Sequence, residues 1–483
     1  MALFSLAMLA LGLVAMVTTG WASYAVLLAV ATLIAAVGWA SGGIDAVLLL
    51  GLPGRIVGLL EHDLLQAVAL YAFIGALLRH GGLAGNVFAA FSRALAALHC
   101  GPALRGALAG YGVGLLAAPM NGSVGASVSL LSHSVAPHWR ESGMGPTQAA
   151  ALTAVSATLG VIVPPSLVLL LLGDAMLRAH TEGLYLAHNT LQRVINTQDV
   201  MQACLPAAFL LAAAWGAVAA WRARRAASSH PACAVVSEAG ASPRGVLAGW
   251  VAASAVFALL ALVAMGYVRA VEAAATAALA AFAHAALTGR LARGGLARTL
   301  DDAMALTGAL FALLLAATTL SLVLRAAGCD RLVADGLAHL AGQPRTATAA
   351  VLGGMLLLAF VLDAFELVFL VVPIVMPPLL AQVPNAAWVA CLTLLTLQAG
   401  FLLPPWGYAV VMTRSLAGGA APRSGAMARE LAPNLLALAA IAALVFAQPG
   451  LAQWLRSAPD SLAPANPAAD VDELLRSMSP PPR

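Results

Sequence analysis

The chain has 483 residues, of which 62% are hydrophobic and only 9% are charged, and its formal net charge is +4. Soluble globular proteins carry about 25% charged residues, so the composition excludes a soluble domain. The positive charge is small and dispersed, which argues against a nucleic-acid partner. Runs of about twenty apolar residues, enough to span a bilayer, recur along most of the length. The sequence therefore predicts an all-α polytopic membrane protein in contact with the lipid bilayer.

A series of apolar runs is predicted to form membrane-spanning helices. The first run is interpreted as a helix and not as a signal peptide, because it lacks a basic n-region and a clear small-residue cleavage site. The runs are Ala2–Val17, Tyr24–Trp39, Leu64–Leu78, Gln148–Leu172, Met201–Trp221, Leu247–Gly266, Val271–Leu287, Met304–Leu324, Ala386–Met412 and Leu435–Ala447.

Two other apolar regions, near 100–140 and 345–383, are interrupted by Gly, Pro, Ser or Asn and are predicted to be broken hairpins. An amphipathic segment precedes each of them, at Val87–Leu98 and Arg331–Leu340. The longest internal polar break, Arg222–Arg244, divides the chain into two parts. The predicted organisation is N-terminal membrane helices over 1–50, a first repeat over 51–221, a cytoplasmic linker over 222–245, scaffold helices over 246–302, a second repeat over 303–448 and a disordered tail over 449–483.

A double proline occurs at equivalent places in the two parts. GVIVPPSLVLL begins at Gly160 and GFLLPPWGYAV begins at Gly400, an offset of 240 residues that Pro164–Pro165 and Pro404–Pro405 share. Proline inside a helix removes a backbone donor and clashes with the preceding turn. At about the same offset, the region around PMNGSVGAS corresponds to the region around LDAFELVF. Interrupted helices at matching positions are typical of a secondary transporter with a site near the membrane midplane.

The arginines predict how the two parts are oriented. If the two hairpins enter from opposite faces of the membrane, most of the arginines fall on the side that carries the linker. Short cytoplasmic loops are enriched in basic residues, so this side is predicted to be cytoplasmic and both termini to lie outside. The predicted fold class is therefore two inverted structural repeats with re-entrant helical hairpins.

The interruptions suggest binding chemistry. Non-helical backbone is tolerated at membrane depth only where protein or a water-filled cavity satisfies it. Carbonyls freed near Gly160 and Gly400, together with hydroxyl and amide oxygens, are hard ligands that suit Na⁺. Helix N-termini at the hairpin tips supply donors for an anionic substrate. The alternative is that the Gly and Ser residues at the first tip only allow close helix packing.

Four acidic residues lie in or beside apolar runs, where carboxylates are rare and usually functional. Asp363 occupies the repeat position of the first tip and is the strongest candidate, with Glu366 one turn further on. Asp174 serves equally well as an interfacial cap. Glu272 follows Arg269 by three residues and could pair with it across one helical turn.

The predicted binding site lies between the two hairpin tips and the two Pro-Pro segments. Its candidate residues are Asn121, Gly122, Ser123, Thr158, Gly160, Pro164, Pro165, Asp363, Gln398, Gly400, Pro404 and Pro405. Na⁺ is expected near Asn121, Ser123, Gly160, Asp363 and Gly400. Neither a catalytic residue nor a cofactor is predicted, and the isolated cysteines are interpreted as small core residues.

The chain resembles the large membrane (M, DctM-like) subunit of tripartite ATP-independent periplasmic (TRAP) transporters, and its second half is similar to the mannitol or chloroaromatic branch. The matching stretches include NGSVGASVSLLSHSVAPHWRESGMGPTQAAALTAVSATLGVIVPPSLVLLLLGD, VLDAFELVFLVVPIVMPPLL and LQAGFLLPPWGYAVVMTRS. The resemblance implies an elevator-type, Na⁺-coupled importer of an organic acid in the bacterial inner membrane. It also implies two partners, a small four-helix membrane subunit and a periplasmic substrate-binding protein.

The chain departs from the family pattern at three places. The first tip is Asn121-Gly122-Ser123 where the family often has Ser-Gly-Ser. A family Thr-Pro-Pro is Leu403-Pro404-Pro405, and a family Thr-Pro-Thr-Glu is Arg269-Ala270-Val271-Glu272. The missing threonine removes a side-chain ligand from a second Na⁺ site, where backbone oxygens would have to serve.

Two other hypotheses stand beside this one. The first is a stand-alone organic-anion transporter of the same inverted-repeat type, which adjacent genes for the two partners would argue against. The second is an intramembrane enzyme or a structural membrane protein. An enzyme would need a paired nucleophile and base, or a metal-ligand set, within the bilayer, and the sequence offers neither.

The predicted orientation can be tested by cysteine labelling of the Arg222–Arg244 linker. A cysteine there is expected to react with a membrane-impermeant maleimide only from the cytoplasmic face, because the arginine bias assigns the linker to that side. Labelling from the periplasm in intact cells would contradict the predicted topology.

Overall fold

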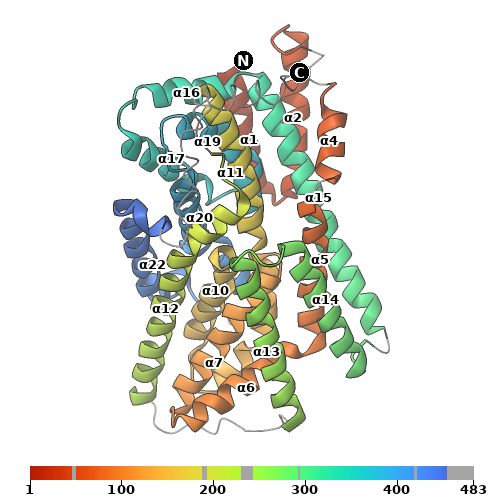
Figure 1. The fold of residues 1–483 in the computed structure, drawn as a ribbon, viewed down its shortest axis with the longest axis vertical. Coiled ribbons are helices and arrows are strands. Elements are labelled where there is room, and N and C mark those ends of the chain that lie inside the picture. The colour runs from red at the N-terminus through yellow and green to blue at the C-terminus, as the bar shows by residue number, and fades with distance from the viewer. Residues whose placement is uncertain are drawn as a thin grey trace, which may run out of the picture.

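A computed structural model describes residues 1–45, 50–61, 63–187, 193–229, 243–291, 294–417 and 421–453. In these ranges the chain is helical (Figure 1). The helices are α1 (Ala2–Thr19), α2 (Ser23–Ala40), α4 (Leu52–Leu60), α5 (Asp63–Gly81), α6 (Leu83–Ala97), α7 (Pro102–Ala117), η1 (Ala118–Met120), α8 (Val124–Ser134), α9 (Ala136–Glu141), α10 (Pro146–Ile162), α11 (Leu167–Leu186), α12 (Thr197–Ser229), α13 (Pro243–Ala264), α14 (Ala270–Leu287), α15 (Gly295–Ala326), α16 (Cys329–Ala338), α17 (Pro344–Leu358), α18 (Ala364–Glu366), the π-helical turn η2 (Leu367–Val371), α19 (Val372–Leu380), α20 (Ala386–Leu402), α21 (Tyr408–Leu416), α22 (Ser424–Ala447) and η4 (Pro449–Ala452).

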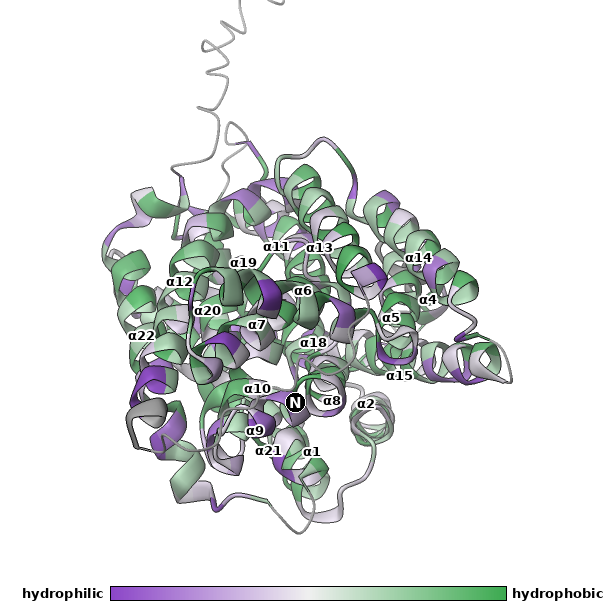
Figure 2. Cartoon of the chain, turned by 90° about the horizontal axis from the view of Figure 1, so that it is seen from below, coloured by the Kyte–Doolittle hydropathy of each residue, from purple (hydrophilic) through white to green (hydrophobic). Residues whose placement is uncertain are grey.

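The outer surface of the helices is as apolar as a lipid-facing surface requires. Figure 2 shows hydrophobic residues over most of the ribbon, on the rim as well as inside, with hydrophilic residues in small groups. Phe209, Phe257 and Leu279 are 75%, 65% and 70% exposed. In the described part of the chain, eight helical segments are long and apolar enough to cross a membrane, or nine if the α5–α6 pair is one broken span. The prediction of an all-helical polytopic membrane protein is confirmed.

The two predicted hairpins are helix pairs that meet at short non-helical tips. The first consists of α7, η1 and α8, and the second consists of α17 followed by α18, η2 and α19. Each amphipathic segment predicted before a hairpin is a helix, α6 in the first case and α16 in the second. The chain bends by 67° between α5 and α6. In Figure 1, α6 and α7 lie at the bottom of the molecule, whereas α16 and α17 lie at the top.

The offset of 240 residues recurs in the helix boundaries. Helix α10 runs from Pro146 to Ile162 and helix α20 from Ala386 to Leu402, so both ends are displaced by 240 positions (386 − 146 and 402 − 162). These two helices pack against each other. The residues that precede the returning helices of the two hairpins, Ser123 and Asp363, are N-cap positions with the same offset.

Each Pro-Pro run consists of two helices that meet at the prolines, and the first pair, Pro146–Leu186, counts as one candidate membrane span. The predicted span Gln148–Leu172 is divided between α10 and α11, and Ala386–Met412 between α20 and α21. Helices α10 and α20 each end two residues before the first proline of the pair, because proline cannot donate to the helix and disfavours helical geometry in the residue before it. The peptide bonds Pro164–Pro165 and Pro404–Pro405 are cis.

Small residues allow α13 and α14 to pack closely against α6 and α5. The buried face of α14 consists of alanines alone, Ala270, Ala273, Ala274, Ala277, Ala278, Ala281 and Ala285, and this helix packs along α5. Helix α13 packs along α6, where a side chain at Gly249 would collide with the Asn86 carbonyl.

Polar contacts join distant helices within the apolar interior. The indole N–H of Trp215 donates to the Asn434 carbonyl at 2.9 Å, and that of Trp388 donates to the Val445 carbonyl at 2.7 Å. These contacts fix α12 and α20 against α22.

Most of the predicted linker and most of the tail lie outside the described residues, so their predictions stay open.

Candidate functional site

The first hairpin tip turns at Gly122 and restarts its helix at Ser123. Gly122 has φ +70°, a left-handed conformation that glycine adopts without strain. A Cβ there would come within 3.1 Å of Tyr71 Cβ on α5. The Ser123 hydroxyl accepts a hydrogen bond from the Ala126 N–H at 3.1 Å, which caps the first turn of α8.

Asn121 holds an amide oxygen that is buried without a donor. Its side chain is 0% exposed, and its Nδ2 donates to the Ser127 hydroxyl at 3.1 Å. The Ser127 hydroxyl in turn donates to the Ser123 carbonyl at 3.1 Å. Among the described residues, Asn121 Oδ1 has no hydrogen-bond partner. An amide oxygen in this situation is suited to accept from a ligand or to coordinate a cation.

A small cavity separates the first tip from the first Pro-Pro segment. Its volume is about 10 Å³, so it suits an ion or a water molecule and is too small for an organic acid. Three hydroxyls line it, from Ser123, Ser127 and Ser166. The other lining residues are Ala118, Pro119, Gly122, Val124, Ala157, Gly160, Leu167 and Val168.

Close packing holds this cavity in shape. A side chain at Gly160 would collide with the Ala118 carbonyl of η1, so glycine lets α10 approach the hairpin. Thr158 is buried, and its hydroxyl donates to the Val155 carbonyl at 3.0 Å. The Thr158 hydroxyl oxygen can therefore still accept a hydrogen bond, but it has no proton left to donate.

Tyr71 of α5 holds the first Pro-Pro segment. Its hydroxyl donates to the Pro165 carbonyl at 3.0 Å, and the contact is buried. Ser166 follows directly and caps α11, because its hydroxyl accepts from the Leu169 N–H at 3.4 Å. One helix thus contacts both the tip, at Gly122, and the proline break.

The second tip is acidic where the first is neutral. Asp363 is half-buried at the N-cap of α18, and its backbone N–H donates to Glu366 Oε2 at 2.9 Å. Glu366 is 1% exposed, and its Oε1 makes no hydrogen bond within the described chain, although Ser23 of α2 lies nearby. None of the ion pairs between described residues involves either carboxylate.

The second Pro-Pro segment lies against the second tip as the first does against its own. A side chain at Gly400 would collide with Ala359, and the Gly407 N–H donates to the Leu403 carbonyl at 2.8 Å. Gln398, which corresponds to Thr158 at the offset of 240, is 0% exposed. Neither its amide oxygen nor its amide nitrogen has a partner among the described residues.

Tyr408 brings the two halves together. It is the first residue of α21, directly after the second Pro-Pro segment. A Cβ on Gly125, in the first turn of α8, would lie 2.6 Å from the Tyr408 hydroxyl oxygen. Tyr408 also lies close enough to Asp363 for an electrostatic interaction. The tip residues of both hairpins therefore approach one phenol side chain.

The two remaining acidic candidates have local partners. Asp174 Oδ2 lies 3.1 Å from Arg178 Nε, one turn along α11. Glu272 Oε2 accepts from the Arg269 backbone N–H at 3.2 Å, so it caps the start of α14 and does not use the arginine side chain for this contact. Within the described residues, no three His, Cys, Asp or Glu side chains gather as a metal site.

Sequence reasoning missed Tyr71, Ser127, Ser166 and Tyr408. Ser166 and Tyr408 follow the double prolines closely, and a polar residue beside a helix break was the available signal. Tyr71 had no such signal, because its partner lies 94 residues away in the chain.

The importance of Tyr71 for the break can be measured by Tyr71→Phe. This change leaves the buried Pro165 carbonyl without its donor, so we expect a loss of about 1–2 kcal/mol in unfolding free energy and faster amide exchange over 166–170. Tyr111→Phe is the matched control, because Tyr111 donates a similar bond to the Ala212 carbonyl at 2.7 Å. It should cost similar stability without changing exchange at 166–170. Equal exchange in both variants would mean that Tyr71 does not hold the break.

Comparison with protein-family models identifies the class of protein. Residues 3–451 match the family model described as "Tripartite ATP-independent periplasmic transporter, DctM component". No curated protein matches the chain. The YdaH transporter of Alcanivorax borkumensis is a similar solved structure, with 16% identity, a TM-score of 0.56, and coverage of 85% of this chain and 90% of that one. At this identity the structural similarity shows a shared fold alone.

The family match covers most of the chain, so the chain belongs to the DctM family of TRAP transporters. It is a multi-pass membrane component of such a transporter in the cytoplasmic membrane, and it is not an enzyme.

Proposed function

We propose that this DctM-family chain is the permease of a Na⁺-coupled secondary importer that carries an organic acid into the cell. The observation behind the proposal is that each broken hairpin tip faces a proline break and that buried polar atoms without partners lie around them. Asn121, Glu366 and Gln398 supply such atoms. An unpartnered buried polar group costs roughly 1–3 kcal/mol, so a bound ion or substrate is the expected compensation.

Two inverted repeats and an elevator movement are the proposed working arrangement. The α6–α7 and α16–α17 pairs lie at opposite ends of the molecule (Figure 1), which is the placement that hairpins entering from opposite faces require. The shared offset of α10 and α20 supports the same relation. A carrier with halves related in this way can present one central site to each side of the membrane in turn.

The first proposed Na⁺ site is the small cavity at the first tip. The lining offers oxygens from Ser123, Ser127, Ser166 and the backbone near Gly160, and the unpartnered amide oxygen of Asn121, the residue before Gly122, is the further ligand that we propose. Neutral hydroxyl, amide and carbonyl oxygens are hard ligands that suit a monovalent cation. The cavity has room for such an ion and for little else.

The second proposed Na⁺ site uses Asp363 and the backbone near Gly400. Leu403 supplies no side-chain oxygen before Pro404, so a carboxylate and carbonyls carry the coordination. A negative charge at membrane depth is costly without a cation, and the described ion pairs give Asp363 none. Na⁺ provides the compensation that the protein itself does not.

The proposed cargo binds where the two tips meet at Tyr408. The first turn of α8 lies beside Tyr408 at Gly125, and helix N-termini favour anionic groups. This supports an organic acid as the substrate.

TRAP systems imply two partners, a small four-helix membrane subunit and a periplasmic substrate-binding protein, and we propose that both are needed here. We expect the purified chain alone not to transport in liposomes with a Na⁺ gradient, and uptake of labelled organic acids to appear when both partners are added. The same liposomes with K⁺ in place of Na⁺ are the control. Robust uptake by the chain alone would favour the alternative, a stand-alone organic-anion transporter.

The ion role of Asp363 can be tested without knowing the cargo. Na⁺ that binds the folded protein raises its melting temperature as its concentration rises, so Tm is followed against NaCl, with choline chloride holding ionic strength constant. Asp363→Asn is expected to need at least tenfold more Na⁺ for the same rise in Tm. Asp174→Asn is the matched control, because that carboxylate pairs with Arg178, and its Na⁺ dependence should not change.

An unaltered Na⁺ response in Asp363→Asn would reduce that carboxylate to a structural partner of the hairpin. Asn121→Ala then distinguishes the two sites, since it removes the unpartnered amide oxygen of the first tip. A Na⁺ response that survives both substitutions would contradict the proposed coordination as a whole.

A further inference from the structure

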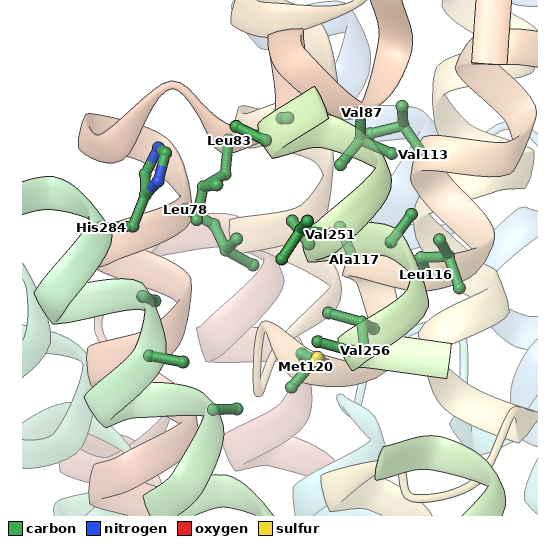
Figure 3. A pocket seen from close by; sticks show the side chains of 18 of the residues that line it. Leu78, Leu83, Val87, Val113, Leu116, Ala117, Met120, Val251, Val256 and His284 are labelled. Carbon is green, nitrogen blue, oxygen red and sulfur yellow. The ribbon is translucent and has the colours of Figure 1, made fainter. Parts of the chain in front are cut away.

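An apolar cavity of about 420 Å³ lies apart from the polar atoms of the two tips. It is bounded by α13 and α14 on one side and by α5, α6 and α7 on the other. Figure 3 shows Leu78, Leu83, Val87, Val113, Val251 and Val256 around it. Its volume lies within the range of roughly 300–1,000 Å³ that small-ligand sites occupy.

The cavity is long and narrow. Its wall on α13 extends from Arg244 to Leu259, which is about 22 Å along a helix that rises 1.5 Å per residue. That length exceeds half of the hydrocarbon core, about 15 Å. Leu247 and Val251 on this wall are 65% and 60% exposed, so the cavity keeps large apolar side chains uncovered.

One end of the cavity is basic, and the rest is apolar. Arg244 begins the wall on α13, and His284 lies near the end of α14. These positions lie at the same end, because the two helices are joined by the short loop 265–269 and run in opposite directions. The Arg290 guanidinium lies beside Gly82 and close to His284.

None of these basic groups has an acidic partner among the described residues. The ion pairs in the described ranges involve other arginines and histidines. The Nε2 atom of His284 is buried and makes no hydrogen bond, and Figure 3 shows this ring at the edge of the cavity. The basic end therefore presents two arginines without acidic partners in the described chain and a ring nitrogen without a hydrogen bond, which together can bind an anion.

We propose that the cavity binds an anionic diacyl phospholipid. The phosphate lies at Arg244, His284 and Arg290, and one acyl chain follows α13 toward Met120. Basic residues at the cytoplasmic surface attract anionic lipid headgroups, and a chain of methylenes is the ligand that a narrow apolar cavity favours.

The dimensions favour an acyl chain over a helix of a partner protein. A helix with its side chains is about 10 Å across, which is wider than the space left between α13 and α6, because these two helices pack along each other. A helix can cover the opening but cannot occupy the interior without separating α13 from α6. An acyl chain fits without this movement.

The lipid tail would lie against the first hairpin. Val113, Leu116, Ala117 and Met120 line the far part of the cavity, and Met120 directly precedes Asn121 of the tip. The bound chain would therefore support the entering arm of the hairpin next to its tip. This site is independent of which acid or ion the protein carries.

The test uses the full-length chain in nanodiscs that contain phosphatidylglycerol with a photoactivatable group on one acyl chain. We expect labelled peptides from 248–259 and 113–120. Ala255→Trp fills the cavity and should reduce this labelling at least fivefold. Ala258→Trp is the matched control, because Ala258 is an exposed alanine on the same helix that does not line the cavity, and its labelling should be unchanged.

Two further outcomes would overturn the proposal. Labelling that is equal with a phosphatidylcholine probe, or unaffected by Arg244→Gln, would show that the basic end does not select an anionic headgroup. Labelling that disappears when the chain is co-purified with its membrane partner would assign the cavity to protein contact. Melting temperatures of the variants, matched within a few degrees, keep loss of labelling distinct from loss of folding.

Discussion

Backbone groups that leave a helix inside an apolar slab must find partners within the protein, and this constraint organises the molecule. The chain leaves helical geometry at two tips and at two double prolines. At the first tip and break, Ser123 caps α8 and Tyr71 donates to the Pro165 carbonyl. At the second, Glu366 accepts from the Asp363 N–H, and the Gly407 N–H returns to the Leu403 carbonyl. Among the buried side-chain atoms without a partner in the described chain, Asn121 Oδ1, Glu366 Oε1 and the two amide atoms of Gln398 belong to the candidate site.

The two half-sites follow one plan but differ in charge. Glycine allows each Pro-Pro helix to approach its own tip, at Gly160 in the first half and at Gly400 in the second. The first tip offers an amide and hydroxyls, whereas the second offers two carboxylates, Asp363 and Glu366. Equivalent backbone positions therefore present different ligands. A neutral oxygen cage and an acidic one differ in how strongly they hold a cation, so the two halves are not interchangeable in the coupling that we propose.

Much of the fold was predictable, because a repeat and its interruptions are local features of sequence. The offset of 240 residues predicted the matching helices, and the double prolines marked the breaks, although each predicted span there proved to be two helices. Contacts between distant segments were not predictable. Tyr71 reaches a carbonyl 94 positions away, and Tyr408 meets Gly125 and Asp363 from a third helix. The periodicity of a sequence does not predict such side-chain contacts, because they depend on how the helices are placed in space.

The alanine face of α14 has a consequence for movement. Helix α5 contacts the first tip and the first proline break on one side, and on another it packs against α14. The buried residues of α14 present only methyl groups to their neighbours. Two helices that pack through long, interdigitated side chains must withdraw those side chains before either can slide, whereas methyl groups allow close approach with little interlocking. The exception on this contact is the pair Phe73 and Phe282, whose ring centroids lie 6.3 Å apart, so these two rings would have to separate before α5 could slide along α14.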